Sequence, residues 1–280
     1  MGPPPLSSAC ASGLLTLSTD GIKRAIRLGW DEMSESYQAE TLISLDDIHY
    51  SPLCPGERDL GIIGDVRGKR TLELACGAAQ NSIALAKWGA DATAIDLSER
   101  QLAHARELMV SEGVQVNLIR GDVERLDLLR AGCFDLVVSC FGMEFLPNAE
   151  ACLRGCFRTL RDGGLLVIGT VHPLTAFEWD DDEQALLVTD YFNPPVEVWE
   201  EPTEDDEQKG LTFFRTVSEM FALLTEAGFA VEQVIEPAPY GAADPRRLHT
   251  PYGGAYWESQ RGRLSKTPFA IVYKARKPAA

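Results

Sequence analysis

The order of apolar and polar residues along the chain is typical of an α/β protein. Short apolar runs at 71–75, 91–97, 117–122 and 134–141 have the length of buried strands. Between them lie stretches such as 82–88, in which apolar residues recur at helical spacing. Because strand and helix signals alternate, the pattern predicts a mainly parallel sheet that is covered by helices on both faces.

The C-terminal part of the chain continues this pattern. Residues 160–170 contain a Gly-Gly turn and a fifth strand, and residues 218–227 form a helix that ends at Gly228. Residues 230–236 and 269–274 are typical of a final pair of strands. With 280 residues, of which 45% are hydrophobic, the chain is long enough for one α/β domain with insertions.

Residues 71–81, TLELACGAAQN, are the segment that says most about chemistry. A strand, a turn of small residues and the start of a helix follow one another here. Such a turn directs the N–H groups of the helix N-terminus toward a ligand, although the same residues also suit ordinary packing. Asp96 ends the next strand about twenty residues later, where a ribose-binding acid belongs.

The turn does not fit a dinucleotide. That ligand requires Gly-x-Gly-x-x-Gly so that the backbone can approach two phosphates, and of these glycines the turn has Gly77 alone. Glu73 lies in the strand beneath the turn, and its carboxylate suits a ligand with a positive charge. A nicotinamide-dependent oxidoreductase is therefore disfavoured, but it is kept as an alternative function.

The stretch Glu-Leu-Ala-Cys-Gly-Ala-Ala at 73–79 resembles motif I of the class I S-adenosylmethionine-dependent methyltransferases, in particular the small-molecule type. The family often has Gly where Ala75 and Ala79 stand here. The resemblance is specific over 66–170 and weaker over 213–274. It implies a Rossmann-like, seven-stranded, mainly parallel sheet with an antiparallel last strand. The implied cofactor is S-adenosyl-L-methionine, and the implied product is S-adenosyl-L-homocysteine.

The resemblance also implies the residues that bind the cofactor. In the family, the acid at the position of Asp122 lies near the adenine amino group, and the backbone N–H of Val123 reaches the ring. An aromatic-rich helix often precedes motif I as a lid, with Tyr37 as the contact here, although such residues also pack at a domain rim. In the family, a residue near Ser98 or Gln101 can also approach the adenine, although the capping box that these two residues form explains the pair by itself. The predicted cofactor-binding residues are Tyr37, Glu73, Ala75, Gly77, Asp96, Leu97, Gln101, Asp122, Val123 and Ser139.

The acceptor side of the site is less well defined. His49 and Tyr50 lie in a loop rich in Pro and Gly, where recognition residues concentrate but idle exposed side chains are also common. His172 follows the fifth strand at the ligand-binding edge and is the predicted catalytic base, unless it only shapes the pocket or hydrogen-bonds the loop. Glu144 stands where many small-molecule methyltransferases carry His. The predicted substrate-binding residues are His49, Tyr50, Phe141, Glu144, Tyr191, Tyr252 and Trp257.

Several segments outside the core are expected to surround the site. Two helices are predicted ahead of motif I, at 21–28 and 30–41. The aromatic residues of the later insertions favour a cover over the active site, whereas their acidic runs are also explained as solvated loops. The predicted boundaries are 1–20 for a flexible tail, 21–65 for a helical lid, 66–280 for the methyltransferase domain, 174–212 for a cap insertion and 237–266 for a lid loop.

Charge and cysteine usage narrow the range of partners. The net charge is −16 and the pI is about 4.7, so the surface repels nucleic-acid backbones and anionic membranes. The seven cysteines are scattered; Cys152 and Cys156, one helical turn apart, are better explained by packing than as metal ligands, and no metal is expected. Reduced thiols, the lack of a secretory signal at the start and the lack of a membrane-length apolar run favour a cytoplasmic protein.

These observations lead to one main hypothesis. The chain is expected to transfer a methyl group to an O, N or C atom of a small organic acceptor, such as a secondary metabolite. In-line transfer requires the nucleophile about 3 Å from the methyl group, and a base only if the acceptor must lose a proton. A non-catalytic S-adenosylmethionine-binding regulatory protein is the second alternative, and a homo-oligomer is left open.

Overall fold

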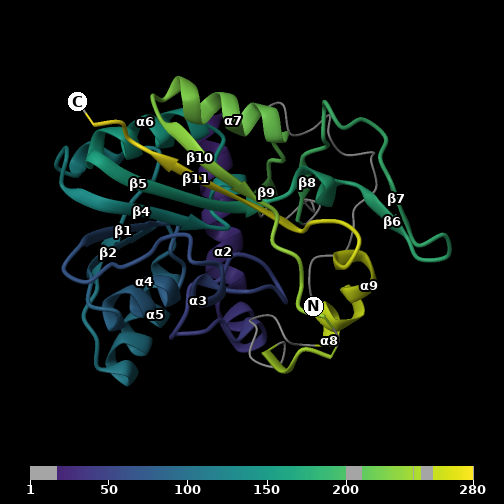
Figure 1. Ribbon diagram of the computed structural model, residues 1–280, viewed down its shortest axis with the longest axis horizontal. Coiled ribbons are helices and arrows are strands. Elements are labelled where there is room, and N and C mark those ends of the chain that lie inside the picture. The colour runs from purple at the N-terminus through teal and green to yellow at the C-terminus, as the bar shows by residue number, and fades with distance from the viewer. Residues whose placement is uncertain (1–17, 200–209, 242, 247–254, 280) are drawn as a thin grey trace.

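The central element is a seven-stranded sheet with helices on both faces (Figure 1). The computed structural model describes residues 18–199, 210–241, 243–246 and 255–279. The strand order is β10-β11-β5-β4-β1-β2-β3, and β11 runs antiparallel to both β5 and β10. The predicted Rossmann-like sheet with an antiparallel last strand is therefore confirmed.

The elements lie close to their predicted positions. The strands of the sheet are β1 (Arg70–Leu74), β2 (Asp91–Asp96), β3 (Asn117–Arg120), β4 (Phe134–Cys140), β5 (Leu160–Val171), β10 (Ala230–Ile235) and β11 (Ala270–Arg276). The helices are α2 (Thr19–Thr41), α3 (Glu57–Leu60), α4 (Gln80–Lys87), α5 (Glu99–Glu112), α6 (Ala149–Thr159), α7 (Val217–Glu226), α8 (Ala255–Ser259) and α9 (Arg261–Leu264). The 3-10 turns are η1 (Leu126–Leu128), η2 (Met143–Phe145) and η3 (Pro173–Ala176). Two hairpins outside the sheet consist of β6 (Glu178–Asp180) with β7 (Ala185–Leu187), and of β8 (Glu197–Val198) with β9 (Leu211–Thr212).

The central strands are buried on both faces, which explains their unbroken apolar runs. In β4, Val137 packs in the core under α6 and α7, whereas Leu136 and Val138 pack in the core on the opposite face. Cys152 and Cys156 of α6 are fully buried in the first of these cores. Within the described ranges, no group of three or more His, Cys, Asp or Glu side chains is arranged to hold a metal ion.

The segment before the sheet differs from its prediction, because the two expected helices form the single helix α2. Ser18 caps it by accepting a hydrogen bond from the Gly21 N–H at 3.2 Å. Residues 18–20 therefore begin the helix and do not belong to a tail, and residues 1–17 lie outside the described chain. Helix α2 continues through Gly29, which packs against the Trp199 ring. A Cβ added at position 29 would lie 3.3 Å from that ring. This packing favours the continuous helix.

The predicted cap insertion contains two hairpins with different surroundings. The β6–β7 hairpin projects away from the sheet, as Figure 1 shows at the right of the molecule. The β8–β9 hairpin packs on α2, where Val198 and Leu211 join Ile26 in a small apolar core. Only the second hairpin therefore contributes to the surroundings of α2 at the site described below. The predicted lid loop contains α8 and α9, and its residues 242 and 247–254 lie outside the described chain.

Candidate functional site

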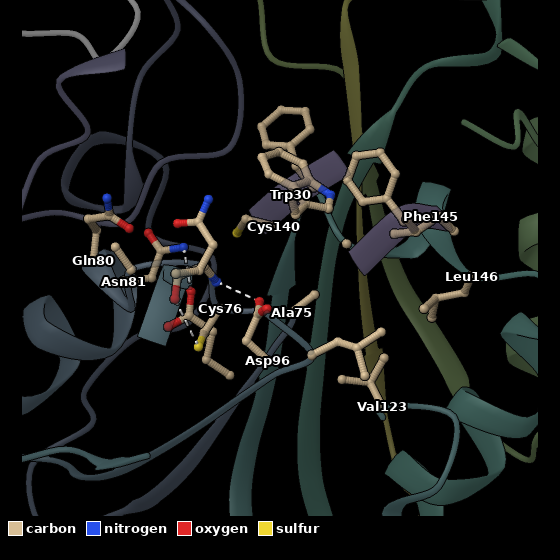
Figure 2. Close-up of a pocket in the computed structure, with 18 of the residues that line it drawn as sticks. Trp30, Ala75, Cys76, Gln80, Asn81, Asp96, Val123, Cys140, Phe145 and Leu146 are labelled. Carbon is tan, nitrogen blue, oxygen red and sulfur yellow. Dashed lines mark hydrogen bonds between the residues drawn. The ribbon is translucent and has the colours of Figure 1, made fainter. Parts of the chain in front are cut away.

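A large cavity lies at the carboxyl ends of the parallel strands, where open α/β sheets bind ligands. Its empty space, counted to the open mouth, is about 910 Å³. One wall comes from the β1–α4 turn and the ends of β2 and β3, and α2 and the segment after β4 complete the others (Figure 2). The cavity is within the size range of small-molecule and cofactor sites.

The turn after β1 has an unusual backbone. Ala75, Gly77 and Ala79 have φ values of 49°, 53° and 57°, in the left-handed region that favours glycine. Strain of this kind in residues other than glycine is concentrated at functional sites. The backbone therefore keeps the glycine-type conformation at Ala75 and Ala79, although the sequence has alanine there.

A close approach between β1 and β4 shapes the same wall. A Cβ added to Gly142 would lie 2.6 Å from the Ala75 Cβ and 2.9 Å from the Ser139 Oγ, so only glycine fits without a shift. Gly142 is not among the residues predicted from the sequence, although a glycine directly after the predicted fourth strand is a signal for such a close approach. Ser139 does not line the cavity: it is buried and donates to the Leu74 carbonyl at 3.3 Å. The structure thus gives no support to the prediction that Ser139 binds the cofactor.

Asp96, at the end of β2, connects the turn to helix α5. Its Oδ2 accepts from the Gly77 N–H at 2.8 Å, and its Oδ1 accepts from the Ser98 N–H at 2.8 Å. Burial raises the pKa of Asp96 to about 6, because the charged carboxylate is desolvated. Leu97 and Gln101 also line the cavity, and the Ser98 Oγ accepts from the Gln101 N–H at 3.1 Å as the predicted cap.

Glu73 lies beneath the turn and accepts hydrogen bonds from donors in the first turn of α4. Its Oε2 accepts from the Ser82 N–H at 2.8 Å and from the Ser82 Oγ at 2.6 Å, and its Oε1 accepts from the Asn81 Nδ2 at 3.0 Å. A carboxylate at a helix N-terminus is electrostatically favourable. Burial nevertheless raises the pKa of Glu73 to about 7. Glu73 therefore places ionisable negative charge at the floor of the cavity.

The opposite end of the cavity is lined by Asp122 and Val123, together with Lys23 of α2. The Lys23 Nζ lies 2.7 Å from the Asp122 Oδ2 and 2.5 Å from the Glu124 Oε2. This link between the predicted lid helix and a predicted cofactor residue was not anticipated from the sequence. It belongs to a contact between segments 99 residues apart, which no local pattern reveals.

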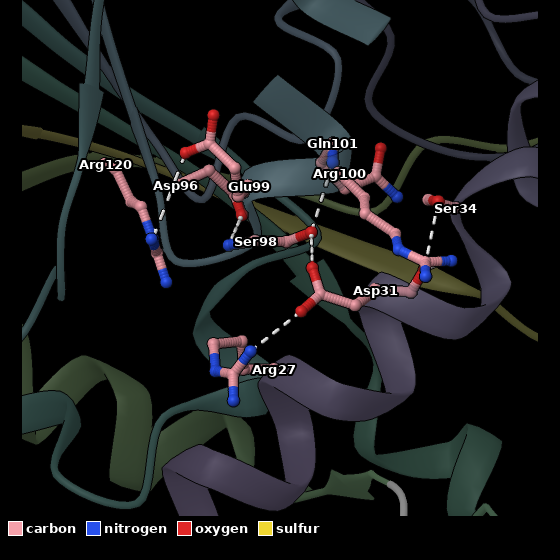
Figure 3. A network of polar contacts seen from close by, with 9 residues as sticks. All are labelled: Arg27, Asp31, Ser34, Asp96, Ser98, Glu99, Arg100, Gln101 and Arg120. Atoms are coloured by element: carbon pink, nitrogen blue, oxygen red, sulfur yellow. Dashed lines mark hydrogen bonds and ion pairs between the residues drawn. The ribbon is translucent and has the colours of Figure 1, made fainter. Parts of the chain in front are cut away.

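Further polar contacts hold α2 against the cofactor side (Figure 3). Asp31 accepts from the Ser98 Oγ at 2.6 Å and from the Arg27 Nη1 at 2.9 Å. Gln38 donates to the Gln101 Oε1 at 2.9 Å. The Gln101 Nε2 is buried at the cavity and has no hydrogen-bond partner among the described residues. A buried amide donor of this kind is expected to have a partner, which a bound ligand would supply.

Two of the predicted acceptor-side residues meet at the cavity wall. The rings of His49 and Phe141 stack with centroids 6.0 Å apart and planes 23° apart. Phe141 has φ 58°, a further left-handed residue at this site. The Asn81 Oδ1 accepts from the His49 backbone N–H at 3.3 Å and lies 3.0 Å from the His49 Nδ1.

Other predicted acceptor-side residues lie away from the cavity. Tyr50 is fully buried in the core and donates to the Glu57 Oε2 at 2.8 Å, so its placement does not support substrate binding. Glu144 is also buried and accepts from the Thr170 Oγ1 at 3.0 Å, which leaves it outside the cavity lining. Both side chains satisfy other buried polar groups, a role that the sequence pattern does not distinguish from ligand binding.

Tyr191 and Trp257, the residues predicted in the two insertions that the structure describes, do not line the cavity either. Tyr191 packs on the ring of Phe192, with centroids 5.8 Å apart. Trp257 contacts the Phe269 ring at 5.2 Å, and Phe269 contacts Phe141 at 6.0 Å, so Trp257 is one ring removed from the cavity wall. Tyr252 lies outside the described residues.

The prediction that His172 is the catalytic base also needs correction. It does not line the cavity, its Nδ1 accepts from the Leu174 N–H at 3.1 Å, and its Nε2 lies 3.0 Å from the Glu236 Oε1. Because the Nδ1 lone pair is used by a backbone donor, the Nε2 carries the proton toward Glu236. His172 thus caps the η3 turn, and this placement does not support a role as base.

An aromatic cluster that sequence reasoning did not assemble closes one end of the cavity. The Trp30, Phe145 and Trp199 rings meet edge to face, with centroids 5.3–5.4 Å apart. Trp30 also meets Tyr37 at 5.1 Å, and Trp30, Tyr37 and Phe145 line the cavity. The Trp199 Nε1 donates to the Thr212 Oγ1 at 2.9 Å. Three elements that are distant in sequence therefore build this wall.

No helix within the described ranges combines the length and apolar character needed to cross a membrane.

Comparisons with known proteins agree with this geometry. Residues 72–168 match the family model described as a methyltransferase domain. The chain is 25% identical over 191 residues to an uncharacterized methyltransferase of Bacillus subtilis, covering 66% of this chain and 74% of that protein. It is 33% identical over 111 residues to the ubiquinone biosynthesis O-methyltransferase of Bordetella avium, covering 40% of this chain and 46% of that protein.

Among solved structures, the fold is similar to that of an S-adenosylmethionine dependent methyltransferase from Mesorhizobium loti. The TM-score is 0.61 at 22% identity, and the match covers 78% of this chain and 94% of the other. At this identity the similarity establishes a common fold. The family match runs from β1 to β5 and therefore covers the strands that form the cavity floor.

Proposed function

We propose that this chain, which belongs to the class I S-adenosylmethionine-dependent methyltransferases, methylates an O, N or C atom of a small organic molecule. The observation that carries the proposal is the convergence of Glu73, Gly77, Asp96 and Asp122 on one cavity at the carboxyl ends of parallel strands. These residues lie in the family-matched part of the chain.

The cavity residues fit the cofactor group by group. The Asp96 carboxylate is suited to accept hydrogen bonds from ribose hydroxyls, and the small residues of the turn allow the backbone to approach a ligand. Asp122 and Val123 suit the adenine, with an acid for its amino group. The buried Gln101 Nε2 offers an unused donor at the same wall.

When bound, S-adenosylmethionine supplies a methyl group on a sulfonium whose leaving group departs neutral. The task of the protein is then to hold the acceptor atom in line and to exclude water. Tyr37 and Phe141 line the cavity and are suited to attract the sulfonium by cation–π interaction. Glu73 also lines the cavity, and its carboxylate adds negative charge that suits the positively charged sulfonium.

The shape and charge of the molecule support a small acceptor. The cavity is bounded by α2 and by the ring cluster of Trp30, Phe145 and Trp199, which suits an organic molecule with apolar surface. A net charge of −16 argues against a nucleic-acid acceptor. A secondary metabolite as acceptor and a cytoplasmic location are parts of this proposal.

Calorimetry with three ligands tests the cofactor side of the proposal. S-adenosylhomocysteine and S-adenosylmethionine should bind, and NAD should not, because the turn lacks the glycines that a pyrophosphate needs. Methyl transfer from labelled S-adenosylmethionine to small phenols, thiols and amines then tests catalysis. Tight NAD binding without a response to S-adenosylhomocysteine would contradict the proposal, and cofactor binding without any transfer would favour a regulatory protein.

A further inference from the structure

We propose that His49 accepts the proton of the acceptor during transfer to a hydroxyl oxygen, and that Asn81 and Glu73 hold it in the tautomer that this task requires. The inference deepens the proposed function and rests on it. It also replaces His172, whose position after the fifth strand had made it the predicted base.

The first step is the orientation of the Asn81 amide. Its Nδ2 donates to the Glu73 Oε1 at 3.0 Å, while its Oδ1 accepts from the His49 backbone N–H at 3.3 Å. Since a backbone N–H can only donate, the oxygen of Asn81 faces His49 and the nitrogen faces Glu73. The carboxylate and the backbone group thus agree on one orientation of the amide.

The second step is the tautomer of His49. The His49 Nδ1 lies 3.0 Å from the same Asn81 Oδ1, an atom that can only accept. The Nδ1 therefore carries the proton, and the Nε2 carries the lone pair. His172 shows the opposite arrangement, because its Nδ1 accepts from the Leu174 N–H.

The third step is the position of the ring. His49 is 7% exposed, lines the main cavity and stacks on Phe141, which follows the central strand β4. Burial lowers the pKa of His49 to about 4, so the ring is neutral at physiological pH and able to accept a proton. A base held by a second group that fixes its orientation is the arrangement that activates nucleophiles in many enzymes.

His49 also lines a second cavity, whose empty space, counted in the same way as that of the first cavity, is about 600 Å³. The lining of that cavity includes the polar side chains of Asp47, Arg58 and Tyr240. The two cavities share His49 as a common wall residue.

The step balances without a further reactant. The hydroxyl oxygen forms a bond to the methyl carbon, and the carbon–sulfur bond breaks with its electron pair remaining on the sulfur. The hydroxyl proton moves to the His49 Nε2, which gives an imidazolium that later releases the proton to solvent. The proton becomes strongly acidic as the carbon–oxygen bond forms, so a weakly basic imidazole is sufficient.

Nitrogen NMR of the ring-labelled protein, saturated with S-adenosylhomocysteine, tests the tautomer directly. We expect His49 to be protonated on Nδ1 and not on Nε2. Asn81→Ala should raise the population protonated on Nε2, a change that a merely structural Asn81 would not produce. A His49 protonated on Nε2 in the wild-type protein would overturn the proposal, whether or not an acceptor is turned over.

His49→Asn tests the chemistry, because the asparagine amide keeps a donor toward Asn81 but cannot accept a proton at neutral pH. Catechol and thiophenol serve as probes, since the first reacts as a neutral hydroxyl and the second is already a thiolate. We expect kcat for catechol to fall by about 10²–10⁴-fold and kcat for thiophenol by less than about tenfold. Equal losses for both probes would overturn the proposal, as they would indicate a structural role.

The same measurements separate this inference from the proposed function. Failure to bind S-adenosylhomocysteine contradicts the cofactor assignment, and His49 is not then at issue. If the cofactor binds and wild type methylates neither probe, the result counts against a phenol-type acceptor, and the tautomer measurement decides on His49. Wild-type turnover with no selective loss in His49→Asn contradicts the inference alone.

Discussion

The two halves of the cavity are built in different ways. The cofactor half comes mainly from residues 71–123, in which Gly77, Asp96 and Asp122 lie at or just after the end of a parallel strand. The acceptor half is assembled from Trp30 of α2, His49 of a loop, Phe141 and Phe145 after β4, and the neighbouring Trp199 of an insertion. One half depends on backbone geometry within a short stretch, and the other depends on side chains that meet across the fold.

Because the two halves are built differently, they restrict the amino-acid sequence in different ways. A left-handed turn and a carboxylate at a helix start restrict residue types at fixed positions, so the cofactor half leaves a local pattern. Edge-to-face rings about 5 Å apart can be supplied by many positions and by any large aromatic residue. The acceptor half therefore leaves no spacing that can be recognised along the chain.

The largest effect is expected for Trp199→Ala, which should damage the acceptor half alone. Trp199 is 8% exposed and packs on Trp30 and Phe145, so its loss should lower the free energy of unfolding by about 3–5 kcal/mol. Chemical denaturation measures this change. Trp179→Ala, on the projecting β6–β7 hairpin, is the matched control and should cost less than about 1 kcal/mol.

Calorimetry on Trp199→Ala examines whether the halves are separable. The affinity for S-adenosylhomocysteine should change little at temperatures where the variant is folded. A loss of affinity as large as that of a cofactor-site variant would show that the two halves act as one unit.

The next effect is the loss of cofactor affinity in Asp96→Ala. Removing a charged hydrogen-bond acceptor for the ribose hydroxyls should weaken S-adenosylhomocysteine binding by about 1.5–3 kcal/mol, or roughly 10–150-fold. Asp127→Ala, an exposed acid outside the cavity, should leave the affinity unchanged. An undiminished affinity in Asp96→Ala would remove Asp96 from the cofactor site.

A smaller effect is expected from pH, because burial raises the pKa of Glu73 to about 7 and that of Asp96 to about 6. Both acids should be ionised when the cofactor is bound, so affinity for S-adenosylhomocysteine should fall by about 10–20-fold from about pH 8 to about pH 6. Glu73→Gln should flatten the upper part of this curve, and Asp127→Asn should not. A flat wild-type curve would argue against contact of these acids with the ligand.

In the ligand-free protein, the contribution of these two acids to stability changes with pH in the direction opposite to that of the ligand affinity. Because both folded-state pKa values are raised, the folded chain binds more protons than the unfolded chain between about pH 4 and pH 7. The contribution of these two acids to stability therefore decreases as pH rises through that window. Denaturation at several pH values measures this, with Glu73→Gln as the comparison.

The smallest effect concerns the backbone of the cofactor half. Ala75 has φ 49°, so Ala75→Gly should relieve left-handed strain and raise stability by about 0.5–1 kcal/mol after the entropic cost of glycine. Ala103→Gly, at an exposed position within α5, should instead lower stability by about 1 kcal/mol. If Ala75→Gly and Ala103→Gly both lowered stability by a similar amount, the result would contradict the claim that the turn favours glycine at position 75.

Much of the fold and of the cofactor half can be predicted from the residues alone, because both follow from local rules. Apolar runs of strand length, alternating with helical periodicity, predicted the strands of the sheet to within a few residues. Small residues between β1 and α4, with Asp96 about twenty residues beyond, located the ligand-binding turn. Each of these signals depends on neighbours along the chain.

The rest depended on how distant segments pack in three dimensions. His49 and His172 are both buried histidines near ligand-type elements, yet only His49 borders the cavity, because Asn81 and Phe141 hold it there while a turn engages His172. Tyr50 and Glu144 became partners for other buried polar groups. Which buried side chain satisfies a neighbour and which faces a ligand is a matter of long-range geometry, and residue order along a chain carries little information about it.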